Sequence, residues 1–221
     1  SNRATNLQKE LGFELVSDET ELKSTEIIIV AVGTPALDNV FSQLKTFVDQ
    51  QVVVSVSGGS TIELMHKYLP EKPVAFAIPN TPVSIDEGVT GISYADEFTE
   101  QQRNLTKEVF EKMGRLIEVP ESQLGILGTV AGCSPAFIDV LIEALSDAGV
   151  LNGLPRELSY EAVIQMLIGS AKLAQQHNGH VAELKEQVTS PGGSTIRGVA
   201  ALEEYGFRNA LIKAVDKANN G

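Results

Sequence analysis

The stretch of this sequence best suited to chemistry is residues 190–197, Ser-Pro-Gly-Gly-Ser-Thr-Ile-Arg. Gly192 and Gly193 precede an expected helix over residues 194–204, and glycines let backbone N–H groups approach a ligand closely. The amino end of a helix adds partial positive charge, which suits a carboxylate or a phosphate. Thr195 adds a hydroxyl that donates or accepts a hydrogen bond. The spacing indicates an anion site, and a plain capped helix start fits it equally well.

Other reactive side chains lack partners at the spacing that their chemistry needs. Cys133 is the single cysteine, so no disulfide forms within the chain, and no histidine and acid are placed beside it by motif. The residues after it, Ser134 and Pro135, are typical of a helix N-cap and a first helical residue. His177 and His180 are three residues apart without the cysteine or carboxylate pattern of a zinc site. We therefore expect no metal site.

Three uncharged, β-branched runs predict strands that are buried on both faces of a parallel sheet. These runs are residues 27–32, 52–56 and 74–78. Each is followed by a small, polar or turn-forming segment: residues 33–35, 57–60 and 79–82. Ligands of open α/β sheets bind at the carboxyl ends of the strands. Three such ends at one edge favour a ligand cleft there, although each segment alone fits an ordinary connecting turn.

Helical patterns between and after these runs predict an α/β, doubly wound, Rossmann-like N-terminal domain. The expected helices are residues 36–49, 61–68 and 100–113, with the end of an earlier helix at 6–11 and a late strand at 116–119. No Gly-x-Gly-x-x-Gly turn is present. The pattern places that turn upstream of Ser1, so we expect the first βα unit of the domain to be missing.

The pattern becomes helical in the second half of the chain, which predicts two domains, residues 1–122 and 123–221. A helix expected over about residues 160–176 is apolar or small nearly all round, so it must be buried on all sides. We interpret this as a helical dimer core that a second subunit covers. Burial against the first domain of the same chain is the alternative.

Composition narrows the class of function. The 221 residues are 43% hydrophobic and carry 17 basic against 29 acidic side chains, a net charge of −12. So negative a protein repels phosphate backbones and anionic lipid surfaces, which argues against nucleic-acid and membrane partners. The longest dense apolar run, residues 27–32, is too short to cross a bilayer. The start of the sequence does not resemble a signal peptide, so we expect a cytoplasmic protein.

Several stretches, read in order, resemble the signature motifs of one enzyme family. They are residues 78–82 (Ile-Pro-Asn-Thr-Pro) with Glu87-Gly88, 132–137 (Gly-Cys-Ser-Pro-Ala-Phe), 143–156, and 188–196 (Val-Thr-Ser-Pro-Gly-Gly-Ser-Thr-Ile). On these motifs the chain is similar to the pyrroline-5-carboxylate reductase family over essentially its whole length. Three positions depart from the family. Ala-Val-Lys-Pro is replaced at residues 31–35 by Ala-Val-Gly-Thr-Pro, which lacks the lysine and is one residue longer; a common aspartate is Gly125 here; and a His-Pro pair is His180-Val181.

The resemblance implies NAD(P)H-dependent reduction of 1-pyrroline-5-carboxylate to L-proline, in a homodimer or higher oligomer formed through the C-terminal helices. It implies that Thr195 is catalytic and addresses the ring nitrogen of the substrate. The substrate-binding residues it implies are Glu121, Gly192, Gly193, Ser194 and Thr195. NADPH, or NADH, would be held by Ser1, Asn2, Arg3, Ala31, Val32, Gly33, Thr34, Val56, Ser57, Gly58 and Asn80. Arg3 would favour NADPH by meeting the 2′-phosphate.

Two other functions stay open. The two-domain plan also fits a β-hydroxyacid dehydrogenase, which needs a lysine as acid on the central helical segment, and Lys172 is the nearby candidate. The absent phosphate-binding turn also fits a non-catalytic dimeric remnant that captures no cofactor. A loss of activity of a hundredfold or more on replacing Lys172 would favour the dehydrogenase, whereas micromolar binding of NADPH would reject the remnant.

Overall fold

A computed structural model describes residues 2–16 and 19–220 of the chain. It divides into two compact units, Ser1–Gly128 (unit 1) and Thr129–Gly221 (unit 2). Our sequence analysis placed the domain boundary six residues earlier, after residue 122. The assignment of different functions to the two sides of that boundary stays a prediction. Ser1, which we predicted to contact the cofactor, lies outside the described residues.

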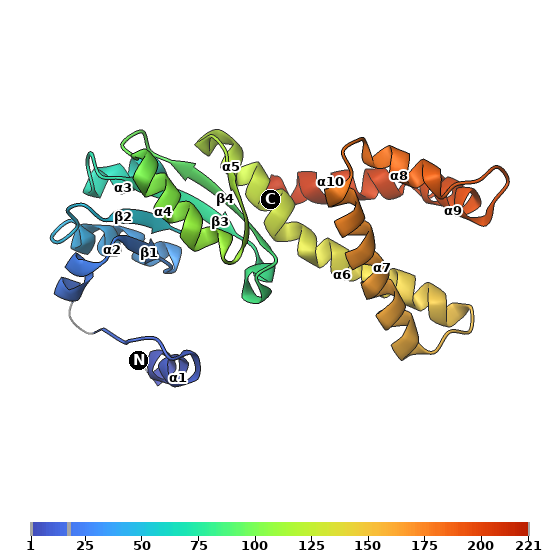
Figure 1. Ribbon diagram of the computed structural model, residues 1–221, viewed down its shortest axis with the longest axis horizontal. Helices are drawn as coiled ribbons and strands as arrows, with labels where there is room; N and C mark the ends of the chain where they lie inside the picture. The colour runs from blue at the N-terminus through green and yellow to red at the C-terminus, as the bar shows by residue number, and fades with distance from the viewer. Residues whose placement is uncertain (1, 17–18, 221) are drawn as a thin grey trace. The chain divides into compact units, whose positions relative to one another are not determined.

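Unit 1 is built on a five-stranded sheet whose strands are adjacent in chain order (Figure 1). The strands are β1 (Ile27–Val30), β2 (Val52–Ser55), β3 (Val74–Pro79), β4 (Gly88–Tyr94) and β5 (Gly114–Glu118). The β1–β2, β2–β3 and β4–β5 pairs are parallel, and β3 and β4 are antiparallel. The predicted α/β fold is therefore confirmed, and the carboxyl ends of β1, β2 and β3 lie at the same edge of the sheet.

Strand β4 is missing from our sequence prediction, and it reverses the direction of the sheet. A crossover to a parallel strand needs about a dozen residues or more. Between β3 and β4 the chain has only the short helical turn η3 (Thr81–Ile85) and its flanking residues, so β4 returns antiparallel. Gly88 and Gly91 interrupt the apolar pattern that made the other strands recognisable.

Helices cover both faces of the sheet. They are α2 (Leu37–Leu44), α3 (Ile62–Tyr68), α4 (Glu100–Glu111) and α5 (Glu121–Gly128). The other helical elements of unit 1 are α1 (Asn2–Leu11) and the short turns η1 (Glu19–Ser24) and η2 (Thr34–Ala36). Side chains alternate along β2: Val53 packs in a cluster with α2 and α3, whereas Val52 and Val54 pack in a cluster with Phe110 of α4. All four residues of β2 are buried, as the sequence predicts for a strand covered on both faces.

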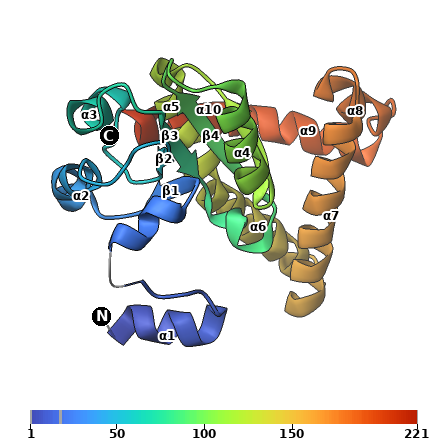
Figure 2. The same ribbon diagram turned by 60° about the vertical axis from the view of Figure 1, so that its left-hand side comes forward.

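Unit 2 is entirely helical in its described part. It contains the wide helical turn η4 (Thr129–Cys133), α6 (Ser134–Leu151), α7 (Arg156–Gln176), α8 (Val181–Gln187), α9 (Ser194–Glu204) and α10 (Phe207–Asn219) (Figure 2). Helices α6 and α7 are joined by a short turn and pack through small residues. The buried Ser159 hydroxyl of α7 donates a hydrogen bond to the Ser146 carbonyl of α6, at 2.9 Å.

The predicted helix start at Ser134 is wrong. Cys133 already has helical angles (φ −87°, ψ −33°), and the chain is helical without a break from Glu121 to Leu151. Pro135 has no N–H to donate to the carbonyl four residues earlier. The wide η4 turn directly before it lets the helix continue past that missing donor.

The surface of unit 2 is unusually apolar. Among residues 129–220 only Ser146 and Ser159 are fully buried, while large apolar side chains of every helix of this unit are exposed. The helical stretch Glu121–Leu151 is also long and apolar enough to span a membrane, by length and composition, and none of its most apolar window is buried within the chain. Our sequence-based expectation was that no segment has this property. These helices therefore present apolar faces that nothing within unit 2 covers.

Candidate functional site

The predicted anion site in unit 2 is a tight turn that leads into α9. The Gly193 N–H donates to the Ser190 carbonyl at 3.0 Å, which closes a four-residue turn. Pro191 and Gly192 occupy its two central positions, and Gly192 has a φ of +68°. A type II turn favours proline first and requires a positive φ second, which glycine supplies at no steric cost. The Ser-Pro-Gly-Gly order thus specifies this turn locally.

One further hydrogen bond holds the turn in place, and Gly193 fits closely within it. The Arg197 guanidinium reaches back to donate to the Gly192 carbonyl at 2.6 Å. A β-carbon on Gly193 would lie 2.6 Å from the Ser190 hydroxyl oxygen and 3.1 Å from its carbonyl oxygen, so a larger residue there must displace the turn. Our sequence analysis missed this role of Arg197. The available signal was its position in the first turn of the expected helix, three residues after Ser194.

The structure brings the predicted substrate-binding residues of this turn together at an open surface of unit 2. Ser194 and Thr195 are exposed and are the first two residues of α9, so their N–H groups precede the first hydrogen bond within the helix. The Gly193 N–H, in contrast, is already engaged by Ser190. Of the three predicted N–H donors, Ser194 and Thr195 are thus the two best placed to receive an anion.

The predicted cofactor residues of unit 1 gather at the carboxyl ends of the strands. Ala31, Val32, Gly33 and Thr34 follow β1, and Val56, Ser57 and Gly58 follow β2. The Ser57 hydroxyl accepts from the Val32 N–H at 2.8 Å and donates to the Val30 carbonyl at 3.2 Å. The Thr34 hydroxyl donates to the Gly58 carbonyl at 2.8 Å.

The backbone of these turns is open at two of their glycines. A β-carbon on Gly58 would meet no atom within 4 Å, and one on Gly33 would meet only the Pro35 ring, at 3.8 Å. Small residues with open space beside the backbone at the carboxyl edge of a Rossmann-like sheet fit a nicotinamide nucleotide. The residues present in unit 1 therefore suit this cofactor.

Two other predicted site residues, Asn80 and Glu121, have structural partners of their own. The Asn80 side-chain oxygen accepts from the Val89 N–H at 2.8 Å and ties the end of β3 to the start of β4. The Glu121 carboxylate accepts from the Ile62 N–H at 2.8 Å, which fastens the start of α5 to the start of α3. Asn2 and Arg3 lie in the first turn of α1, where the Arg3 side chain is exposed.

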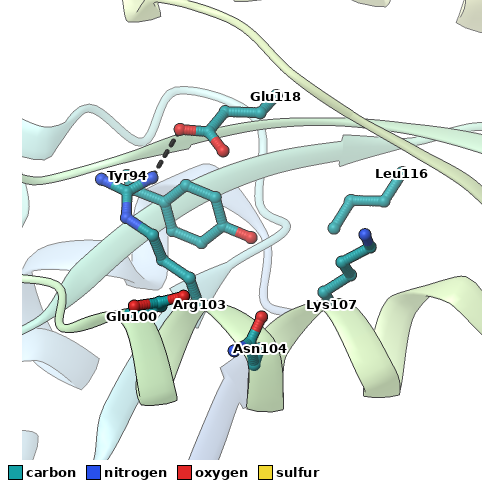
Figure 3. A pocket seen from close by; sticks show the side chains of 7 residues that line it. All are labelled: Tyr94, Glu100, Arg103, Asn104, Lys107, Leu116 and Glu118. Carbon is teal, nitrogen blue, oxygen red and sulfur yellow. Dashed lines mark hydrogen bonds and ion pairs between the residues drawn. The ribbon is translucent and has the colours of Figure 1, made fainter.

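Away from these turns, unit 1 has a cavity of about 300 Å³ between α4 and the strands β4 and β5 (Figure 3). Arg103 stacks over the Tyr94 ring, 4.6 Å from its centroid, and forms an ion pair with Glu118. Burial, and to a smaller extent Glu118, raises the pKa of Tyr94 to about 12. Tyr94 pairs with Ala75, at the start of β3. This cavity therefore lies at the edge of the sheet opposite the turns that follow β1 and β2.

Metal-binding chemistry has no obvious place in the described part of the chain, where no three His, Cys, Asp or Glu side chains come together. His177 instead pairs with Glu183 at 3.1 Å. Each unit therefore has one candidate site: the turn before α9 in unit 2 and the strand-end turns in unit 1.

Comparison with known proteins agrees with this geometry. Residues 121–221 match the family described as "Pyrroline-5-carboxylate reductase dimerisation". A pyrroline-5-carboxylate reductase from Synechocystis sp. is 36% identical over 213 residues, which cover 96% of this chain and 80% of that relative. One from Methanosarcina acetivorans is 33% identical over 216 residues, with the same two coverages.

Solved structures give the same result. A pyrroline-5-carboxylate reductase from Coxiella burnetii has a TM-score of 0.91 at 28% identity, covering 100% of this chain and 83% of that one. The Plasmodium falciparum enzyme, solved with NADP bound, has a TM-score of 0.82 at 30% identity, covering 93% of this chain and 79% of that one. The chain therefore belongs to the pyrroline-5-carboxylate reductase family.

Proposed function

We propose that this protein reduces 1-pyrroline-5-carboxylate to L-proline with NADPH or NADH. The observation that carries the proposal is the Pro-Gly-Gly turn before α9, which presents Thr195 and two early helix N–H groups at an open surface. A cyclic imine with a carboxylate needs both kinds of group: donors that fix the acid, and a hydroxyl that addresses the ring nitrogen.

The proposed chemistry divides between the two units. In unit 2, the N–H groups of Ser194 and Thr195 bind the substrate carboxylate, assisted by the open backbone at Gly192. The Thr195 hydroxyl bonds to the ring nitrogen and orients the C=N bond. When bound to unit 1, the nicotinamide nucleotide supplies the hydride that adds to the imine carbon. The nitrogen carries one proton, which it holds already as an iminium or takes from water, and the carbon gains one hydrogen, which converts C=N to CH–NH.

We assign cofactor binding to the strand-end turns of unit 1, at residues 31–34 and 56–58 and at Asn80. The roles of Asn2 and Arg3 near the nucleotide remain predictions, as does a preference for NADPH through Arg3. Direct substrate contact by Glu121 is also a prediction, and its bond to the Ile62 N–H indicates that the carboxylate additionally positions α3.

We further propose that the protein works as a homodimer in which a second copy covers the helices of unit 2. The exposed apolar side chains of α6 and α7 support this, because soluble monomers rarely leave contiguous apolar surface of this extent open. The same pairing accounts for the apolar stretch 121–151 without a membrane. A cytoplasmic location and assemblies larger than a dimer remain predictions.

Replacement of Thr195 tests the proposed reaction. We expect Thr195→Val to lower kcat for pyrroline-5-carboxylate at least tenfold, because the ring nitrogen loses its hydroxyl partner. Thr195→Ser, which keeps the hydroxyl, should stay within a few-fold of the parent. The measurement is pyrroline-5-carboxylate-dependent oxidation of NADPH, followed by absorbance.

Lys172→Ala is the control that separates the reductase from a β-hydroxyacid dehydrogenase. Lys172 lies on the exposed surface of α7 and has no part in the proposed reaction, so its loss should leave turnover nearly unchanged. A loss of a hundredfold or more would instead favour a lysine acid. Unchanged kinetics for Thr195→Val would remove Thr195 from the mechanism.

A further inference from the structure

The turns that follow β1 and β2 are joined in both directions by side-chain hydroxyls. Thr34, in the first turn, donates to the Gly58 carbonyl of the second at 2.8 Å. Ser57, in the second turn, accepts from the Val32 N–H of the first at 2.8 Å and donates to the Val30 carbonyl at 3.2 Å. We call Thr34 and Ser57 together the hydroxyl latch.

A second set of hydrogen bonds, made by Ser55 and Ser60, holds the segment that contains Ser57. The Ser55 and Ser60 hydroxyls form a hydrogen bond of 2.7 Å, and both side chains are buried. The Ser57 N–H also lies 3.4 Å from the Ser55 hydroxyl oxygen. Because Ser57 is only 4% exposed, its hydroxyl is enclosed by protein partners and serves the backbone of the turns.

The Thr34 side of the latch fits closely against a glycine. Gly59 has a φ of +83°, and a β-carbon there would lie 2.7 Å from the Thr34 methyl carbon. Thr34 also belongs to the segment, residues 33–35, in which this chain departs from the lysine-containing motif that it otherwise resembles. Thr34 therefore contacts both Gly58, through a hydrogen bond, and Gly59, through its methyl group.

We propose that Thr34 and Ser57 are positioning residues that hold the two turns at a fixed spacing, ready to receive the nicotinamide nucleotide. This inference rests on the proposed function, because it takes the turns to be the cofactor site. A site that is already ordered loses less conformational entropy when its ligand binds. The latch acts through the backbone of the turns, so it affects nucleotide affinity more than the chemical step.

Variants of Thr34 test the latch in the full chain. Thr34→Val and Thr34→Ala remove the hydroxyl, and Thr34→Ser keeps it. We expect the Kd for NADPH, measured by its fluorescence, to rise about two- to tenfold for the first two, the range that one neutral hydrogen bond contributes. Thr34→Ser should stay within about twofold of the parent. In the steady state the KM for NADPH should rise by the same factor, with a change in kcat below about twofold.

Thr46→Val is the matched control, because Thr46 likewise donates to a nearby carbonyl, that of Gln43 at 2.8 Å, but at the end of α2. It should leave the Kd unchanged. Unaltered NADPH affinity in Thr34→Val and Thr34→Ala would overturn the latch, as would an equal loss in Thr34→Ser or failure of the parent to bind NADPH. Binding of NADPH without reduction of pyrroline-5-carboxylate would overturn the proposed function alone, since the Kd series still tests the latch.

Discussion

At the scale of single residues, Tyr94 shows how local burial shifts a titration. Its pKa is raised to about 12 mainly because burial disfavours the phenolate, and the nearby Glu118 carboxylate adds repulsion that Arg103 partly offsets. Below pH 10 the phenol is neutral in both folded and unfolded chains, so it adds no pH dependence there. Between pH 10 and 12 the unfolded chain loses this proton first, so the free energy of unfolding should fall as pH rises.

Tyr94→Phe checks this assignment. The chain has four tyrosines, and phenolate absorbance should show one that titrates near pH 12 while the protein is still folded. The variant should lack that late component and keep its turnover, because Tyr94 lies at the sheet edge away from the cofactor turns. A titration curve identical to that of the parent would contradict the proposed environment of Tyr94.

The site residues that could be predicted from sequence are those whose conformation is decided locally. Pro191 and Gly192 specify a type II turn by their own backbone preferences, so the turn was recognisable without any tertiary contact. Glu121 is different, because its partner, the Ile62 N–H, is 59 residues away in the chain. Contacts of that kind depend on how helices pack, which residue types at one position do not reveal.

At the scale of elements, the same distinction separates the strands. Strands β1, β2 and β3 are uncharged runs of mostly apolar residues, and such runs are recognisable in a sequence. The predicted burial on both faces is confirmed for β2 and is wrong for β1, where Ile29 is 43% exposed. Strand β4 contains Gly91, where a β-carbon would lie 2.8 Å from a Leu127 methyl carbon and 2.9 Å from one of Leu124. The glycine is needed for the close approach of α5, a tertiary reason that also hides the strand from a pattern search.

Close packing of two helices gives a prediction at this scale. A β-carbon on Gly149 of α6 would overlap the Ser159 hydroxyl of α7, which cannot turn away without losing its bond to the Ser146 carbonyl. We expect Gly149→Ala to lower the free energy of unfolding by about 1–3 kcal/mol, as overpacking in a close contact does. Urea unfolding at fixed protein concentration measures the change.

Gly125→Ala is the matched control for that experiment. Gly125 is also within a helix, but a β-carbon there would meet no atom within 4 Å. Alanine should therefore be neutral, or stabilising by up to about 1 kcal/mol, since it favours helix over the unfolded chain. Equal stabilities for the two variants would show that α6 and α7 do not pack as closely as described.

At the scale of the whole molecule, the two units differ in how many apolar side chains they bury. Unit 1 has two clusters of buried apolar side chains, one on each face of its sheet. Unit 2 has no fully buried apolar side chain among residues 129–220, although helical stability in proteins comes mostly from packing an apolar face. From the all-round apolar character of α7 we predicted a helix that a second subunit covers, and that cover remains a proposal.

The proposed dimer predicts a mass in solution of about twice the 23.7 kDa of one chain. Ile164 and Ile168 are exposed one helical turn apart on α7, and a charge buried there in a dimer would be desolvated without a partner. Ile168→Lys should therefore shift the sedimentation equilibrium towards monomer at low micromolar concentration. If the face were open to solvent instead, the added positive charge should strengthen association, because it reduces the repulsion between copies that each carry a charge of −12.

The control for this effect is the same substitution at an exposed isoleucine of unit 1. Ile85, in η3, is 70% exposed, and Ile85→Lys should leave the dimer intact because unit 1 already buries its own core. A parent chain that sediments at 23.7 kDa, or an Ile168→Lys variant that associates as tightly as the parent, would contradict a partner seated on α7. With a monomeric parent, the apolar stretch 121–151 would then require another cover, and a membrane surface would be the next to test.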